Sequence, residues 1–202
     1  MRSFKSIGLS AGLLIGQCVS CLFGEIELVT LKWTPYLCSR QCVEALFTQL
    51  SQMPGVKEVT ISQSAAQANL EWHPNAPFSY TTLFARVNFV GIYMTDLRVR
   101  VTGTISQVGS TVILTSMGDR TQFVLLGVIQ PDPHRYVIEF NAETHLLTHE
   151  QRDQLAEIMD RRQIVTIEGP LFEPERAPPL YLTMEKIKVR EEPKNSLKNR
   201  PR

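Results

Sequence analysis

Cys38 and Cys42 are the residues whose type and spacing most clearly suggest chemistry in this sequence. They follow a strand-like stretch that ends near Trp33, and they stand where a segment with helical periodicity begins. The free N–H groups and the dipole at a helix N-terminus stabilise a thiolate. Two thiolates can bind a soft metal ion or can be oxidised to a disulfide. The sequence therefore predicts one of these two uses for the pair.

The residues around the two cysteines leave both uses open. Thiolates select copper(I) among the common metal ions, two of them suffice for a near-linear complex, and Arg40 between them would offset its negative charge. A disulfide is equally compatible with a spacing of four residues, provided that the Cα atoms approach within about 7 Å. A thiol–disulfide oxidoreductase ranks below both, because Cys38 and Cys42 lack the usual Cys-x-x-Cys spacing, and the one such motif, Cys18–Cys21, lies at the end of an apolar N-terminal stretch.

Residues 1–24 have the layout of a secretory signal peptide. Met1–Lys5 is short and basic, and Ser6–Gly16 is apolar but too short to span a bilayer. Val19-Ser20-Cys21 partly resembles the cleavage site of bacterial lipoproteins, which makes Cys21 a candidate for lipidation. We therefore expect an exported protein of the periplasm or cell envelope, attached to a membrane by a lipid anchor if at all. In that compartment Cys38 and Cys42 can form a disulfide.

Composition and charge narrow the classes of partner. The 202 residues are 43% hydrophobic and 20% charged, which is ordinary for a globular protein. The formal net charge of +1 favours neither nucleic acid nor an anionic membrane as a partner. No Gly-rich phosphate loop, nucleophile elbow or paired catalytic carboxylates stand out in the sequence. We expect a protein that is not an enzyme and that binds no nucleic acid.

Hydrophobic periodicity predicts a βαββαβ order for residues 25–96. Pro54-Gly55 ends the first helix and Ser79 caps the second. The predicted strands are 26–31, 56–62, 66–72 and one that begins near residue 94, and the predicted helices are 43–53 and 79–91. This order is typical of the split βαβ, or ferredoxin-like, arrangement.

Residues 25–96 also resemble the heavy-metal-associated domain of copper chaperones and mercury-binding proteins. Cys42 is followed at the family's spacing by Leu46, Leu50 and Gly55-Val56. The resemblance implies a ferredoxin-like domain that binds copper(I), or another soft metal ion, through Cys38 and Cys42 and exchanges it with another envelope protein. The loop departs from the family, because three residues separate the cysteines instead of two and the family's methionine is replaced by Tyr36 or Leu37.

Residues 97–189 predict a second, mainly β domain. The predicted strands are 97–106, 111–115, 122–126, 136–140, 164–169 and 180–189, with a helix that a Thr148–Gln151 capping box begins. Leu155, Ile158 and Met159 form the apolar face of this helix. We interpret these six stretches and the helix as an OB-like β-barrel with one helix, which is a five-stranded fold. The strand from Met94 to Ile105 is expected to be shared between both domains, and residues 190–202 to be a disordered basic tail.

The sequence thus predicts an exported α+β protein that binds copper(I) through a Cys-x3-Cys loop, for metal transfer or sequestration. The alternative is a structural or interaction protein of the envelope whose cysteine pair forms a disulfide. His145 and His149 stand four residues apart, but the Thr148 cap lies between them, so they do not share a helical face, and no Glu stands in the zincin position. His73 lies in a Pro-flanked loop, where the resemblance gives it no metal role. Cys38 and Cys42 therefore remain the only predicted metal ligands.

Overall fold

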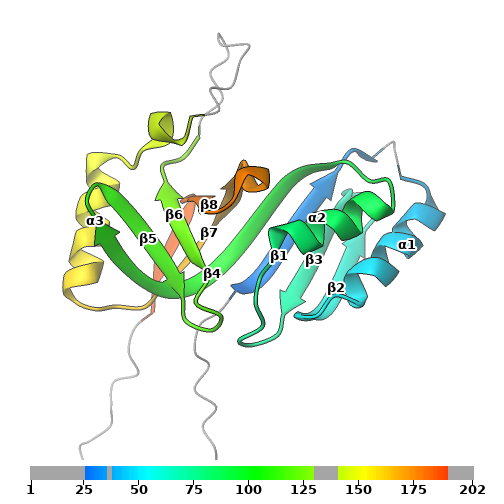
Figure 1. The fold of residues 1–202 in the computed structure, drawn as a ribbon, viewed down its shortest axis with the longest axis horizontal. Coiled ribbons are helices and arrows are strands. Elements are labelled where there is room, and N and C mark those ends of the chain that lie inside the picture. Colours follow the sequence, from blue (N-terminus) through cyan, green and yellow to red (C-terminus); the bar gives the residue numbers. More distant parts are fainter. Residues whose placement is uncertain (1–25, 36–37, 130–140, 191–202) are drawn as a thin grey trace, which may run out of the picture.

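The computed structural model describes residues 26–35, 38–129 and 141–190 (Figure 1). The predicted signal peptide, Cys21, the predicted strand 136–140 and nearly all of the predicted tail lie outside these ranges. The described residues confirm an α+β protein with a large mixed sheet and few helices. Within them, no helix is long and apolar enough to cross a membrane.

Nine strands and three α-helices make up the described structure, together with two 3-10 turns. The first half contains β1 (Ile26–Trp33), α1 (Arg40–Ser51), β2 (Val56–Ser62), β3 (Gln67–Trp72) and α2 (Tyr80–Phe89). The second half contains β4 (Met94–Val108), β5 (Thr111–Ser116), β6 (Gln122–Leu126), η2 (Ala142–His145), α3 (His149–Asp160), β7 (Val165–Phe172), η3 (Pro174–Arg176), β8 (Leu180–Thr183) and β9 (Lys186–Val189).

The first four strands form an antiparallel unit in the order β2-β3-β1-β4. Helices α1 and α2 lie together against one face of this unit (Figure 1). Ser39 and Ser79 cap the two helices, since the side chain of each accepts a hydrogen bond from the N–H group three residues later. These caps fix where each helix begins, and they confirm the predicted alternation of strands and helices.

Strand β4 joins the two halves into a single sheet of nine strands, so the halves do not have separate sheets. Its first part pairs with β1, and after Gly103 it continues as the partner of β5. The pairings β4–β5, β5–β6, β6–β8, β8–β7 and β7–β4 close a ring, in which only β6 and β8 run parallel. The expected sharing of this strand is therefore confirmed, and it makes the two halves mechanically continuous.

The predicted strand 180–189 is interrupted by a bulge. β8 and β9 both pair with β7, but their register shifts by one residue between Leu182 and Lys186. Gly169 of β7 lies opposite the break, and a Cβ atom there would come within 1.7 Å of the Thr183 carbonyl oxygen. The missing side chain lets the two backbones approach at the bulge, which periodicity in the sequence could not reveal.

One continuous core of buried side chains runs through both halves. Leu46 and Leu50 of α1 and Leu155 and Ile158 of α3 are buried as predicted, because they recur at helical spacing. Phe47 stands next to Leu46 at a helical spacing that also favours the core, but its side chain is 48% exposed. The buried stripe of α1 is narrower than the apolar residues in its sequence suggest.

Candidate functional site

The two cysteines lie at the junction between β1 and α1. β1 ends at Trp33, Ser39 caps the helix, and Arg40 is the first residue of α1. The backbone N–H of Cys42 donates a hydrogen bond to the Ser39 hydroxyl, with 3.4 Å between the atoms. Cys38 precedes the cap, and Cys42 belongs to the first turn. The predicted position at a helix N-terminus is therefore confirmed.

The sulfur atoms of Cys38 and Cys42 are joined in a disulfide, with 5.4 Å between the two Cα atoms. The two residues differ in accessibility, since Cys38 is 8% exposed and packs in the core, whereas Cys42 is half-buried at its edge. The cross-link therefore ties the loop residue Cys38 to the first turn of α1. It closes a loop of only a few residues, so its effect is local.

Cys42 faces a shallow pocket between α1 and α2, with a volume of about 530 Å³. The pocket has no charged side chain in its lining, and Phe89, which is 79% exposed, stands at its edge. The lining residues are Ser39, Gln41, Cys42, Ala45, Thr48, Gln49, Phe89 and Val90. This surface offers apolar contact and neutral hydrogen-bonding groups, which suits a neutral partner better than an ion.

Arg40 does not lie where we expected it to act. We expected its charge to support the sulfurs, but its Nε donates to Glu44 Oε1 at 3.1 Å, and 87% of its side chain is exposed. The pair is an exposed salt bridge one helical turn long, which contributes little to stability. The positive end of the α1 dipole is thus the remaining electrostatic support for a thiolate at this site.

The other candidate ligands do not gather around the cysteines. Within the ranges that the structure describes, no group of three or more His, Cys, Asp and Glu side chains is arranged to hold a metal ion. His73 follows β3, and the ring of His145 lies edge-on to Phe172, with 5.3 Å between the ring centroids. Cys21, the candidate for lipidation, lies outside the described residues.

A cluster of charged side chains on β4, β7 and β9 was missed in the sequence. Arg100 donates two hydrogen bonds to the Glu168 carboxylate, at 2.8 and 2.9 Å, and Lys186 donates a third at 3.0 Å. The hydrogen bond from Lys186, with further help from Arg100, holds the pKa of the Glu168 carboxyl below its ordinary value. The alternation of Lys186 and Lys188 with apolar residues was the available signal, but the pairing of distant strands was needed to interpret it.

Exposed aromatic side chains on the helix layer were the second missed feature. Phe47, Phe84, Phe89 and Tyr93 all expose more than a third of their side chains, on or directly after α1 and α2. Phe84 stacks on Tyr80, with 5.5 Å between the ring centroids. Burial, followed by the charge of Glu175, raises the pKa of the Tyr80 phenol. Phe47 and Phe84 have the helical spacing that is typical of core positions, yet both side chains are exposed.

Comparison with the models of known protein families, with curated proteins and with solved structures found no match to this chain. The function must therefore be inferred from the chemistry of its own residues. The two features at hand are the cross-linked helix start and the aromatic, sparsely charged helix layer beside it.

Proposed function

We propose that this protein is a non-enzymatic interaction protein of the cell envelope, and that its Cys38–Cys42 disulfide stabilises a surface on α1 and α2 that binds another envelope protein. The observation that carries the proposal is the pairing of the two sulfurs at bonding distance, with Cys38 buried in the core. A buried, oxidised cysteine cannot offer a thiolate to a metal ion. The cross-link instead serves the structure of the loop that leads into α1.

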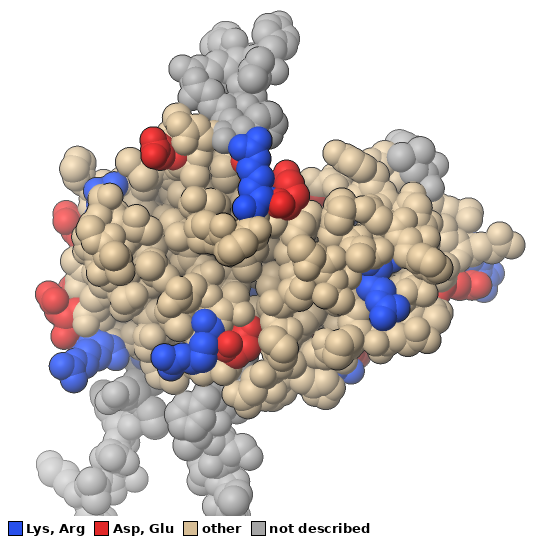
Figure 2. All heavy atoms as spheres, viewed as in Figure 1, with Lys and Arg blue, Asp and Glu red and all other residues tan. Residues whose placement is uncertain are grey.

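The surface next to the disulfide supports a protein partner. Charged side chains are few on the two helices, namely Arg40 and Glu44 on α1 and Arg86 on α2, and Figure 2 shows a mostly uncharged surface over them. Phe89 and Tyr93 are 79% and 73% exposed, and large apolar side chains of this kind are enriched in protein interfaces. The rigid aromatic groups lose little conformational entropy on binding, so they are suited to anchor a partner.

The same proposal assigns fold types to the two halves. The order β2-β3-β1-β4 with two helices on one face supports a ferredoxin-like unit over residues 25–96. The closed ring of β4, β5, β6, β8 and β7, with α3 between β6 and β7, supports an OB-like barrel over residues 97–189. In each unit β4 pairs with a strand whose edge would otherwise be free, β1 in the first unit and β5 in the second.

Export is part of the proposal and has its support in the sequence. A basic start and a short apolar stretch precede the described structure, and a disulfide persists in oxidising compartments. A lipid on Cys21 would leave a few residues between the anchor and β1. The chain would then be attached to a membrane by its N-terminus, with both halves free to contact a partner.

A second candidate function is copper(I) binding by the reduced pair. Its support is the position of Cys42 beside an open pocket at the N-terminus of α1, together with the resemblance of residues 25–96 to heavy-metal-associated domains. Reduction would release two thiolates a few ångströms apart, which is what a two-coordinate copper(I) ion requires. In this case the disulfide would be the resting, metal-free form.

Thiol titration of the mature protein separates the two functions. For the protein that begins at residue 25, we expect no reactive thiol before reduction and two after it. Reduction should lower the free energy of unfolding by about 2 kcal/mol, since the closed loop is short. The reduced protein should show no copper(I) uptake beyond that of a Cys38→Ser, Cys42→Ser variant. Tight one-to-one binding that vanishes in this variant would replace the interaction function with the metal function.

The partner surface is tested by photo-cross-linking in the cell that makes the protein. A benzophenone amino acid at Phe89 should give one discrete cross-linked species, because the aromatic surface is held against its partner. The matched control is the same group at Val108, which is 66% exposed at the far end of β4. Equal cross-linking at both positions, or none at Phe89, would count against a docking surface on the helix layer.

A further inference from the structure

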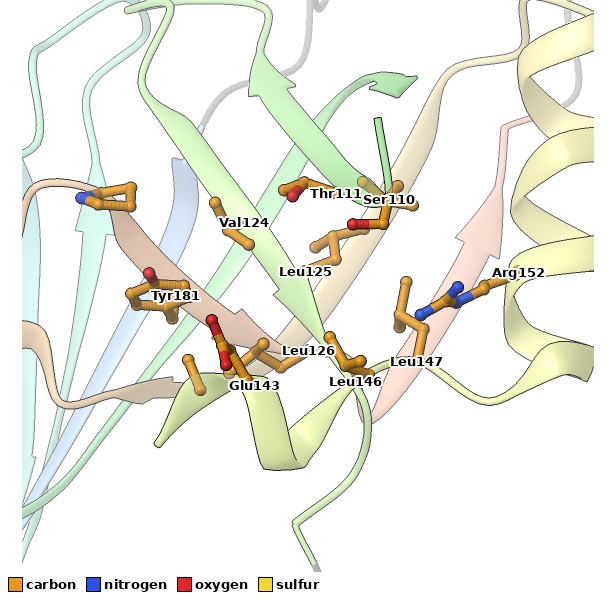
Figure 3. Close-up of a pocket in the computed structure, with 13 residues that line it drawn as sticks. Ser110, Thr111, Val124, Leu125, Leu126, Glu143, Leu146, Leu147, Arg152 and Tyr181 are labelled. Atoms are coloured by element: carbon orange, nitrogen blue, oxygen red, sulfur yellow. The ribbon is translucent and has the colours of Figure 1, made fainter. Parts of the chain in front are cut away.

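A second cavity, remote from the cysteines, lies between the ring of strands and the segment that leads into α3. It has a volume of about 320 Å³, within the range of small-molecule sites (Figure 3). Figure 3 shows Arg152 at one end and Glu143 with Tyr181 at the other, with Leu125 and Leu126 between them. Its apolar lining includes Val112, Val124, Leu125, Leu126, Leu146 and Leu147.

The wall of the cavity is held in place by backbone contacts. The N–H of Gly127 donates to the carbonyl oxygen of His145 at 2.8 Å, so the chain after η2 lies against the end of β6. A Cβ atom at Gly127 would come within 2.7 Å of the Leu146 carbonyl oxygen, and only glycine permits this approach. Leu147 is buried, whereas Leu146 is 56% exposed beside the cavity. The apolar wall is therefore a preformed part of the fold.

Arg152 supplies a positive charge at one end of the cavity. The Thr148–Gln151 capping box fixes the first turn of α3, and Arg152 follows it directly. Figure 3 shows the guanidinium directed from α3 toward Leu147 and Ser110. Arg152 is half-buried, yet its side chain forms no ion pair or hydrogen bond in the ranges that the structure describes. A partly desolvated guanidinium without a partner gains most from a bound anion.

The other arginines of the ring show what Arg152 lacks. Arg98 and Arg100 each pair with a carboxylate on a neighbouring strand, and Arg161, at the other end of α3, pairs with Glu157. Arg152 shares the helix with Arg161 but points its charge into an apolar cavity. The surroundings of the Arg152 guanidinium therefore favour a ligand that carries both a negative charge and apolar surface.

The opposite end of the cavity limits the ligand further. Glu143 and the hydroxyl of Tyr181 lie there, across the apolar floor from Arg152 (Figure 3). The Glu143 carboxylate repels a second anion at this end and accepts an amine or hydroxyl group instead. The ligand's anionic group must therefore face Arg152, with its apolar part over the floor.

We propose that this cavity binds the carboxylate of a short apolar ligand, with the carboxylate on Arg152 and the apolar chain over Leu125 and Leu126. Both a medium-chain fatty acid and the free C-terminus of a short apolar peptide carry this chemistry. The two sources differ at the Glu143 end, because a peptide brings an ammonium group and a fatty acid does not. The site is independent of the cysteine pair and of the helix layer.

Calorimetric titration of the mature protein with octanoate, octanol and the peptide Ala-Leu-Leu tests the site. Octanoate or the peptide should bind more tightly than octanol, which has the chain without the charge. Arg152→Gln should weaken binding of the carboxylate ligand by about tenfold or more, the loss expected for a charge-assisted hydrogen bond. The matched control Arg161→Gln, on the same helix, should leave the affinity unchanged.

Glu143→Gln identifies the source of the carboxylate. If it weakens binding of the peptide but not of octanoate, the site takes a peptide terminus; if octanoate alone binds, the site takes a fatty acid. Octanoate and the peptide binding no better than octanol would overturn the proposal without recourse to a variant. So would carboxylate binding that is unaffected by Arg152→Gln in a variant with an unchanged circular dichroism spectrum.

Discussion

The two halves of the molecule share strand β4 and one core, yet their surfaces are built from different chemistry. The half before β4 presents exposed aromatic side chains and a covalent cross-link, and Figure 2 shows few charges over its helices. The half from β4 onward carries more ion pairs between strands, such as those of Arg98 with Glu185 and of Arg100 with Glu168, whereas the first half has the exposed pair of Lys57 with Glu71. A shared scaffold therefore does not impose a shared surface.

The difference between the two surfaces suggests that the two halves have different roles. Aromatic side chains at the surface gain stability only when a partner covers them, whereas ion pairs between strands are satisfied within the chain. We infer that the first half faces a protein partner and that the second half provides a solvated support with a small-ligand cavity. Mutations that separate the halves, or change only one surface, can test this comparison.

The largest expected effect on stability comes from removing a buried side chain in the second half. Leu155→Ala removes a fully buried side chain of α3 and should lower the free energy of unfolding by about 2–5 kcal/mol. Both tryptophans, Trp33 and Trp72, lie in the first half. Val99 and Val101 of β4 are buried in the core that is common to both halves. The midpoint of urea unfolding should therefore fall by the same amount whether it is followed by tryptophan fluorescence or by circular dichroism.

The converse variant is Leu50→Ala, in α1 of the first half. It should lower the urea midpoints measured by fluorescence and by circular dichroism by a similar amount, since Leu50 is also fully buried. An unchanged tryptophan transition in Leu155→Ala would mean that the halves unfold separately and that β4 does not couple them.

A smaller effect is expected at the bulge between β8 and β9. Gly169→Ala places a methyl group against the Thr183 carbonyl, so the two backbones must move apart, at a cost of about 1–3 kcal/mol. Thermal unfolding measures the loss. The control is Gly109→Asn, which lies in open space with a φ of +61°, a conformation that asparagine tolerates. A Gly169→Ala protein as stable as the control would show that the close approach is not required.

The smallest effect concerns the charged cluster. The ion pairs hold the pKa of Glu168 below its ordinary value in the folded protein, so they stabilise the fold at pH values above that ordinary value. This contribution is lost as the pH falls through the folded pKa. Glu168→Gln should therefore cost less than about 1 kcal/mol at pH 7 and nothing in strong acid. Urea titrations at several pH values measure it.

Glu58→Gln is the control for that titration, because Glu58 is exposed on β2 and makes no ion pair with a described residue. Its pH profile should match that of the parent protein. A Glu168→Gln protein with the same profile as the parent would show that solvent screens the cluster completely.

Much of the fold could be predicted, because periodicity reports burial within a single element. The alternation in 26–31 and the three-and-four spacing of Leu46 and Leu50 place the strand, the helix and the helix start at Cys38–Cys42. The exposure of Phe47 and Phe84 could not be predicted, since it depends on how far a neighbouring element covers the helix. The position of the cysteine pair at the helix start could be predicted, but its oxidised form and the unequal burial of Cys38 and Cys42 could not.

The sequence by itself determined the order of strands and helices, the helix caps and the position of the cysteine pair, because local hydrogen bonds and hydrophobic period suffice for these. Only the tertiary structure decided that β4 pairs with β7 as well as with β1 and β5, that Gly169 faces a bulge and that Arg152, which pairs with no described residue, points into a largely apolar cavity. Each of these depends on contacts between residues far apart in the chain. Such contacts leave no periodic trace in the sequence, because their partners are set by the packing of whole elements.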